Sequence, residues 1–173
     1  YGRGMWAGSL RYHEGKFYVC FASLETSETY IFSAEQPDGP WEKKAIPEYR
    51  HHPSLLVDED GRVYLVSGYE AIQVRELLQD CSAYKPGGVY RTILEPMKED
   101  VYLGYEGSHI QKIHGKYYLF VIYWPKVEPA RRTQLYFMAD SLEGEFVGGE
   151  LLRDDRDYHN QGVAQGGMVE TLN

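Results

Sequence analysis

The chain has 173 residues, enough for one domain with a sizeable core. Aromatic residues make up 14%, with 16 Tyr and 18 Gly, a composition that favours strands and turns over long helices. The formal net charge of -8, without a cluster of Lys and Arg, disfavours a nucleic-acid binder. Neutral, hydroxyl-rich or cationic partners remain open, and no run is long and apolar enough to predict a membrane span.

Two features bear on the cellular compartment. Cys20 and Cys81 lack metal-ligand spacing, so we expect two free, buried thiols or a single disulfide. The chain opens on Tyr1 in the middle of a pattern, and we expect its natural N-terminus to be absent. The bacterial cytoplasm, the periplasm and the outside of the cell therefore all stay open as locations.

One phrase recurs three times along the chain. It consists of an apolar strand, a polar turn that ends in Gly, a basic residue and an aromatic-rich strand, and it occupies residues 9–19, 54–65 and 108–119. Each copy predicts a β-hairpin. A recurrence interval of about 50 residues suits the four strands of a β-propeller blade. A β-sandwich would also contain many short strands, but not this repeated hairpin.

The repeat predicts an all-β fold, with about three blades plus one strand of a β-propeller in a single partial domain over residues 1–173. Further strand-like segments follow each hairpin and complete the blades. The expected blades cover residues 4–46, 50–95 and 104–150, and a further blade begins over residues 163–173.

The first strand of each blade lies nearest the propeller axis, so residues just before these strands converge on one pocket. At the matching position of the three repeats stand Ala7, His52 and Glu106, and Gln165 takes the fourth such position. We therefore expect one carboxyl group, one imidazole and one amide at the axial mouth. Trp6 is expected to line the same pocket. A core aromatic for Trp6 and a strand-pairing role for Gln165 are the alternatives.

Four phrases carry a resemblance to a known family. They are Gly4-Met5-Trp6-Ala7, His51-His52-Pro53-Ser54 with Asp58-Glu59-Asp60-Gly61-Arg62, Tyr105-Glu106-Gly107-Ser108-His109, and residues 160–167. In content and order they resemble glycoside hydrolase family 43, in its arabinofuranosidase and xylosidase branch. The resemblance implies a five-bladed propeller that cleaves arabinose- or xylose-containing plant polysaccharides or oligosaccharides with inversion.

The same resemblance implies roles for single residues. The family uses a general base on the first blade, an Asp that modulates a pKa, and a general-acid Glu, whose position Glu106 matches. His52 stands where the family has the modulating Asp. No residue matches the base, which we expect upstream of Tyr1, so the chain alone should not hydrolyse efficiently. The resemblance implies that no cofactor is required, although family members often hold a calcium or other ion on the axis, for which Gln165 and waters are the candidate contacts.

The chemistry explains why these positions matter. A general acid must hold its proton near neutrality, which requires a pKa raised by burial or by a nearby negative charge. An inverting enzyme also needs a carboxylate base about 6.5–9.5 Å away, which leaves room for water. A neutral His52 could hydrogen-bond Glu106, whereas a cationic one would lower the pKa of the acid.

Further residues are candidates for contacts with a sugar. His109 could orient the substrate or Glu106, or be a packed strand histidine. Trp124 could stack on a sugar ring or anchor a surface loop, and Arg132 could bind sugar hydroxyls or be a solvated charge. His159 and Gln161 could line the pocket. Two other functions stay open, a carbohydrate-binding pseudoenzyme and a propeller that serves as an interaction module.

Overall fold

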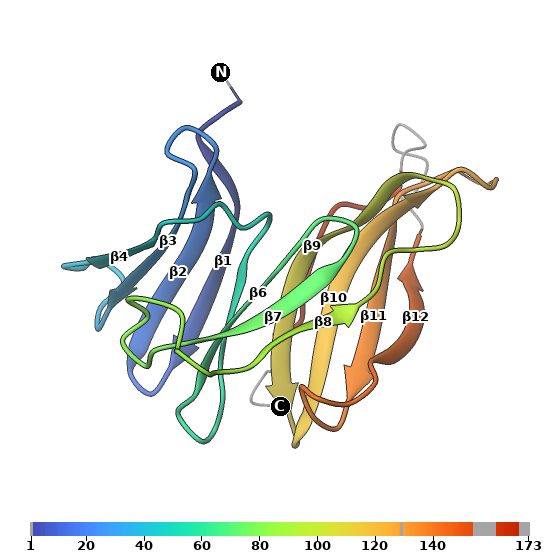
Figure 1. The fold of residues 1–173 in the computed structure, drawn as a ribbon. Coiled ribbons are helices and arrows are strands. Elements are labelled where there is room, and N and C mark those ends of the chain that lie inside the picture. Colours follow the sequence, from blue (N-terminus) through green and yellow to red (C-terminus); the bar gives the residue numbers. More distant parts are fainter. Residues whose placement is uncertain (1, 129, 154–161, 170–173) are drawn as a thin grey trace.

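The computed structural model describes residues 2–128, 130–153 and 162–169. Within these residues there are twelve β-strands and no helix, arranged as three four-stranded antiparallel sheets. In each sheet the strands lie in chain order, so each sheet is a simple meander. Figure 1 shows the three sheets side by side as blades that fan from a common centre. The all-β, blade-like architecture predicted from the repeat is confirmed.

The strands have the following bounds. The first blade contains β1 (Met5–His13), β2 (Lys16–Ser23), β3 (Glu28–Ala34) and β4 (Glu42–Ile46). The second contains β5 (Ser54–Val57), β6 (Val63–Ser67), β7 (Ile72–Leu77) and β8 (Tyr90–Leu94). The third contains β9 (Val101–Ile113), β10 (Lys116–Pro125), β11 (Thr133–Ala139) and β12 (Val147–Leu152).

Two of the predicted hairpins close with the tightest possible loop. Glu14 and Gly15 alone connect β1 to β2, and His114 and Gly115 alone connect β9 to β10. All four residues have a positive φ, between 46° and 82°. This is the conformation that a two-residue turn needs if its twist is to match that of the strands, and Gly adopts it without steric cost.

The core has two parts, one on each side of the second blade. Leu55 and Leu65 pack toward the first blade with Cys20 and Ile31. Their chain neighbours Leu56, Tyr64 and Val66 pack toward the third blade with residues such as Ile110 and Val121. Because side chains alternate along a strand, one short strand supplies both interfaces. Each fully buried Leu contributes about 1.5–3 kcal/mol. Cys20 and Cys81 are free and buried, as in the first of the two alternatives above.

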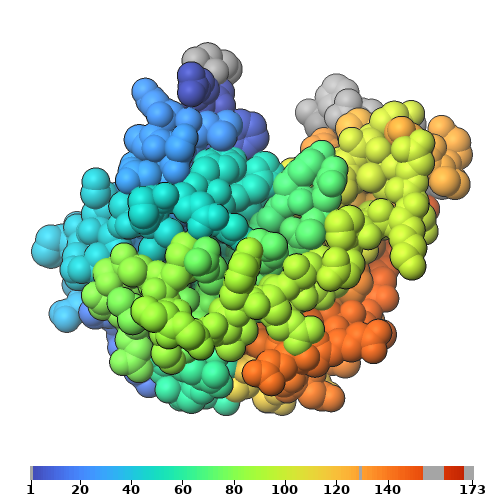
Figure 2. Space-filling model, viewed as in Figure 1, coloured from blue at the N-terminus to red at the C-terminus, as the bar shows by residue number. Residues whose placement is uncertain are grey.

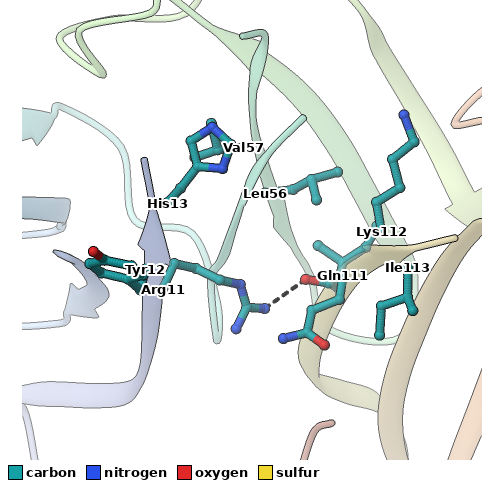
Figure 3. A pocket seen from close by; sticks show the side chains of 9 residues that line it. Arg11, Tyr12, His13, Leu56, Val57, Gln111, Lys112 and Ile113 are labelled. Carbon is teal, nitrogen blue, oxygen red and sulfur yellow. Dashed lines mark hydrogen bonds between the residues drawn. The ribbon is translucent and has the colours of Figure 1, made fainter. Parts of the chain in front are cut away.

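The first strands of the three blades lie next to one another, and Arg11 of β1 connects them. Its guanidinium donates hydrogen bonds to the carbonyl of Leu55 (2.9 Å), the hydroxyl of Ser54 (3.1 Å) and the carbonyl of Ile110 (2.6 Å). Burial lowers the pKa of Arg11 to about 10, so the side chain remains a cation at neutral pH. Figure 3 shows Arg11 reaching from β1 across a hollow of about 280 Å³ toward β9.

The further strand expected over residues 163–173 is not found in the part that is described. Residues 162–169 form one parallel bridge, between Gly162 and Arg132, and otherwise no regular structure. Within this segment, Gln165 and Gly167 lie against Gly107 and His109 of β9. Residues 170–173 lie outside the described ranges.

Among the described residues, no helix is long and apolar enough to cross a membrane. Figure 2 shows a notch between the first and third blades.

Candidate active site

Glu106 is aimed at the centre of the molecule by a β-bulge. It lies in β9 opposite Ile122, and His109 lies opposite Phe120, so Gly107 and Ser108 together face the single residue Val121. Gly107 has a φ of +68°, which suits glycine. An extra residue of this kind bends the strand and re-aims the neighbouring side chains. The Glu106 side chain is 15% exposed.

Two adjacent histidines, His51 and His52, face the Glu106 carboxylate from the segment before β5. Nε2 of His51 lies 2.9 Å from Oε2 of Glu106, and Nδ1 of His52 lies 3.7 Å from the same oxygen. His52 has a φ of +43°, and the two rings stack with centroids 3.8 Å apart. The left-handed residue breaks the alternation of an extended chain, and consecutive side chains thereby point the same way.

Two aromatic side chains complete this cluster. The Tyr49 hydroxyl lies 3.1 Å from Nδ1 of His51, so His51 has a partner on both ring nitrogens. The Trp6 ring lies 6.0 Å from that of His52 at an interplanar angle of 26°. Trp6 therefore lies beside His52, and its place in the lining of a pocket stays a prediction. Together, residues of the first, second and third repeats converge within one small region.

The electrostatics of the cluster differ from what a general acid needs. Burial raises the pKa of Glu106, but the hydrogen bond from His51 and the charges of the histidines and Arg132 outweigh it, and the net shift is downward. Burial, helped by His51, lowers the pKa of His52 to about 4, so His52 is neutral at pH 7. Among the described residues, the surroundings of Glu106 therefore do not provide the raised pKa that a general acid requires, chiefly because of the hydrogen bond from His51.

A hollow of about 740 Å³ beside the cluster contains two of the other candidates, His109 and Gln165. Gln165 packs against Gly107, the residue after Glu106, and a Cβ at Gly107 would lie 2.7 Å from the Gln165 side chain. Nδ1 of His109 lies 3.5 Å from a guanidinium nitrogen of Arg11. Burial, helped by the Arg11 charge, lowers the pKa of His109 to about 4.

The lining of this hollow does not suit calcium. Among the described residues that line it there is no carboxylate, and Arg11 already brings a positive charge. Calcium prefers six to eight oxygen ligands, commonly with carboxylates among them. The axial ion implied by the family resemblance, with Gln165 and waters as its contacts, therefore stays a prediction, for which the described lining offers no carboxylate ligand.

Trp124 and Arg132 lie together in a different hollow, of about 630 Å³, with Tyr102, Leu103 and Ala130. Nε1 of Trp124 donates to the carbonyl of Ala130 (2.7 Å), and the Arg132 guanidinium lies 5.7 Å from the Trp124 ring centre. The charge of Arg132 also acts on Glu106. This hollow combines an aromatic face with a cation whose charge acts on the acid.

Sequence reasoning missed several residues. His51 makes the shortest contact with Glu106, and Tyr49 and Arg11 support the arrangement, yet none of the three was singled out. The only signal for His51 was its place beside His52 in the repeat. The candidates His159 and Gln161 lie outside the described residues.

Comparison with known proteins matches the glycosyl hydrolases family 43 model to residues 1–146. A putative β-xylosidase of Xylanibacter ruminicola is 33% identical over 98% of this chain and 32% of its own length. A xylosidase/arabinosidase of Butyrivibrio fibrisolvens is 32% identical over 68% of this chain and 25% of its own length.

A solved structure also matches this chain in fold and sequence. A bifunctional GH43-CE protein of Bacteroides eggerthii superimposes with a TM-score of 0.87 at 37% identity, over 99% of this chain and 22% of that one. The chain thus spans 22–32% of the length of these three proteins, and its three blades are part of a propeller of the five-bladed type. On the family match, the repeats and the shared fold, this chain belongs to glycosyl hydrolase family 43.

Proposed function

We propose that the protein containing this chain is a glycosidase that cleaves arabinose- or xylose-containing plant polysaccharides or oligosaccharides with inversion. Glu106 is the general acid, which donates its proton to the leaving oxygen of the glycosidic bond. The general base is a carboxylate supplied from outside the 173 residues. The relatives named xylosidase and arabinosidase support the substrate class, since they are about a third identical to this chain.

The observation that carries this proposal is the position of Glu106. Its carboxylate is largely buried where three repeats meet, with His51 and His52 on one side. A buried acid held at a fixed angle is what proton delivery to a bound substrate requires. Asp140, by contrast, is exposed and pairs with Lys116.

Substrate contacts follow from the two hollows. Trp124 presents an aromatic face that can stack on the C–H face of a pentose, and Arg132 beside it can donate to sugar hydroxyls. Trp6 lies beside His52, one of the two histidines that face the acid. His109 and Gln165 reach the larger hollow, and we assign them to binding rather than to chemistry.

A second function is favoured by one specific observation. His52 replaces the family's carboxylate beside the acid, and the described neighbours hold the pKa of Glu106 below its usual value. A site of this kind can retain carbohydrate binding after losing turnover. A carbohydrate-binding pseudoenzyme is therefore the alternative.

The test uses the full-length protein with aryl β-xylosides and aryl α-L-arabinofuranosides. We expect turnover in the wild type and a loss of about 10²–10⁴-fold in Glu106→Gln, the size typical of removing a general acid. Glu99→Gln, at an exposed position, is the matched control. An inert wild type that binds xylo-oligosaccharides in calorimetry would establish the pseudoenzyme instead. Absence of both turnover and binding would overturn both proposals.

A further inference from the structure

Three potential metal ligands lie together in the cluster of His51, His52 and Glu106. One ligand atom from each residue lies within 4.8 Å of the other two. Glu106 Oε2 is 2.9 Å from His51 Nε2 and 3.7 Å from His52 Nδ1. Ligands placed tetrahedrally at about 2.0 Å around a zinc ion lie about 3.3 Å apart. The two measured separations bracket that value, and the separation between the two histidine nitrogens is at most 4.8 Å.

His52 provides an independent sign that a ligand belongs here. Its side chain is 8% exposed, and its Nδ1 atom is buried without a hydrogen-bond partner. An unpartnered polar atom in the interior costs about 1–3 kcal/mol, so most buried polar atoms have a partner. This nitrogen is the one that faces the Glu106 carboxylate. The left-handed backbone at His52, itself uncommon outside glycine, holds it there.

The Tyr49 hydroxyl supplies the hydrogen bond that the second ring nitrogen of a metal-bound histidine normally makes. When His51 Nε2 coordinates an ion, the ring proton resides on Nδ1, which lies 3.1 Å from the Tyr49 hydroxyl. A partner of this kind fixes the tautomer and the ring orientation of a ligating histidine. The hydroxyl can accept from Nδ1–H in the metal-bound form and donate to Nδ1 in the metal-free form.

We propose that His51 Nε2, His52 Nδ1 and the Glu106 carboxylate form a binding site for a divalent transition metal ion such as Zn²⁺. Two imidazoles and one carboxylate suit zinc and its first-row neighbours, whereas calcium and magnesium prefer oxygen ligands. Three protein ligands leave a fourth position for water or a small ligand, the pattern of open rather than structural zinc sites.

The proposed site is independent of glycosidase activity, but the two roles of Glu106 exclude each other. A carboxylate that coordinates a metal is deprotonated and cannot deliver a proton. In an active enzyme, zinc therefore inhibits, and a chelator restores turnover. In a pseudoenzyme the metal still binds.

Binding is measured directly on the full-length protein, by calorimetry with Zn²⁺ and by the visible absorption of Co²⁺. We expect one bound ion that excess Ca²⁺ or Mg²⁺ does not displace. His52→Asn introduces a residue that tolerates the positive φ at this position. In His51→Gln and Glu106→Gln the new side chain has a volume similar to that of the original one. Each is expected to weaken Zn²⁺ binding by more than about tenfold. Even residues that only hydrogen-bond to a metal ligand typically change metal affinity by about 10–100-fold. Tyr49→Phe should weaken binding less.

The control is His114→Asn, at an exposed turn with positive φ, which should bind Zn²⁺ like the wild type. Circular dichroism of every variant checks that the fold is retained. Absence of Zn²⁺ binding in the folded wild type overturns the proposal. So does binding that survives in both folded His51→Gln and His52→Asn. Because no step depends on turnover, these results are separable from a failure of the glycosidase assay.

Discussion

The imidazole of His51 and the carboxylate of Glu106 meet across two blades, with Nε2 2.9 Å from Oε2. The contact joins residues 55 positions apart in the chain and places the acid in a fixed orientation. The Tyr49 hydroxyl contacts the other ring nitrogen of His51. Tyr49, His51 and Glu106 therefore form a chain of contacts from the second blade to the third. The protonation of Glu106 is thereby tied to residues that precede β5.

Removing the imidazole of His51 should raise the pKa of Glu106. In His51→Gln the charge-assisted hydrogen bond is lost, and burial then acts with less opposition. The measurement is an NMR titration of the Glu106 carboxyl carbon under a chelator. Tyr49→Phe, which removes only the outer contact, should change the titration less. An unchanged midpoint in His51→Gln would show that His51 does not control the carboxylate.

Restoring a carboxylate beside the acid should raise turnover. His52→Asp places a negative charge near Glu106 and raises its pKa, and Asp tolerates the φ of +43° at this position. Each unit of increase raises the protonated fraction of Glu106 at neutral pH about tenfold. We expect the alkaline limb of the kcat/KM profile to move to higher pH in the full-length protein. His52→Asn, neutral and of similar size, is the control, and an equal gain in Asn would contradict the charge argument.

Stability should fall between pH 6.5 and pH 4. His52 and His109 both have pKa values lowered from 6.5 to about 4, chiefly by burial. In the unfolded chain both histidines become protonated as the pH falls below 6.5. In the folded chain they become protonated only near pH 4. The stabilisation is thus complete above pH 6.5 and is lost as the pH falls through this window.

This loss is measured as the free energy of unfolding against pH in urea. The double variant His52→Asn with His109→Gln should show a shallower slope across the window. His114→Asn, at the exposed turn, should keep the slope of the wild type. A double variant with an unchanged slope would assign the pH dependence to other groups.

Gly107→Ala should destabilise more than the same change at Gly115. Both residues have positive φ, +68° and +76°, so the backbone cost is similar. A Cβ at Gly107 would lie 2.7 Å from the Cβ of Gln165, whereas nothing lies within 4 Å at Gly115. We expect the difference to exceed about 1 kcal/mol, as for overpacking. Urea denaturation measures it, and adding Gln165→Gly should remove the excess; equal losses at the two glycines would refute the steric account.

Arg11→Met should cost about 2–4 kcal/mol, because it leaves the carbonyls of Leu55 and Ile110 without their donors. Arg62→Met is the control, since Arg62 forms an exposed ion pair with Asp60 that is worth about 1 kcal/mol or less. The two free energies of unfolding are compared in the same buffer. Losses of equal size would mean that Arg11 does not hold the blades together.

Much of the fold could be predicted because hairpin signals are local. The Glu14-Gly15 and His114-Gly115 turns specify their own geometry, and the apolar strands beside them follow from period-two alternation. The convergence of His52 and Glu106 followed from the radial arrangement of the blades. The further strand expected over residues 163–173 is not formed in the described residues 162–169, which make a single bridge to Arg132.

The contacts that tune the site could not be predicted, because they depend on single backbone angles and on side chains far apart in the chain. An extended segment would point His51 and His52 to opposite sides, and only the φ of +43° at His52 brings both to the acid. Nothing local distinguishes Arg11 from any other strand arginine. The lowered pKa of Glu106 likewise follows from His51, whose partner is 55 residues away.

The bond between Arg11 and Ile110 spans 99 positions of the chain. During translation each hairpin can close as soon as it leaves the ribosome. The hydrogen bond from Arg11 to Ile110, in contrast, can form only after the third blade has been made. We therefore expect the blades to form one after another and to pack together only after β9 has been made. A ribosome that pauses between β8 and β9 would hold the first two blades with this guanidinium only partly satisfied.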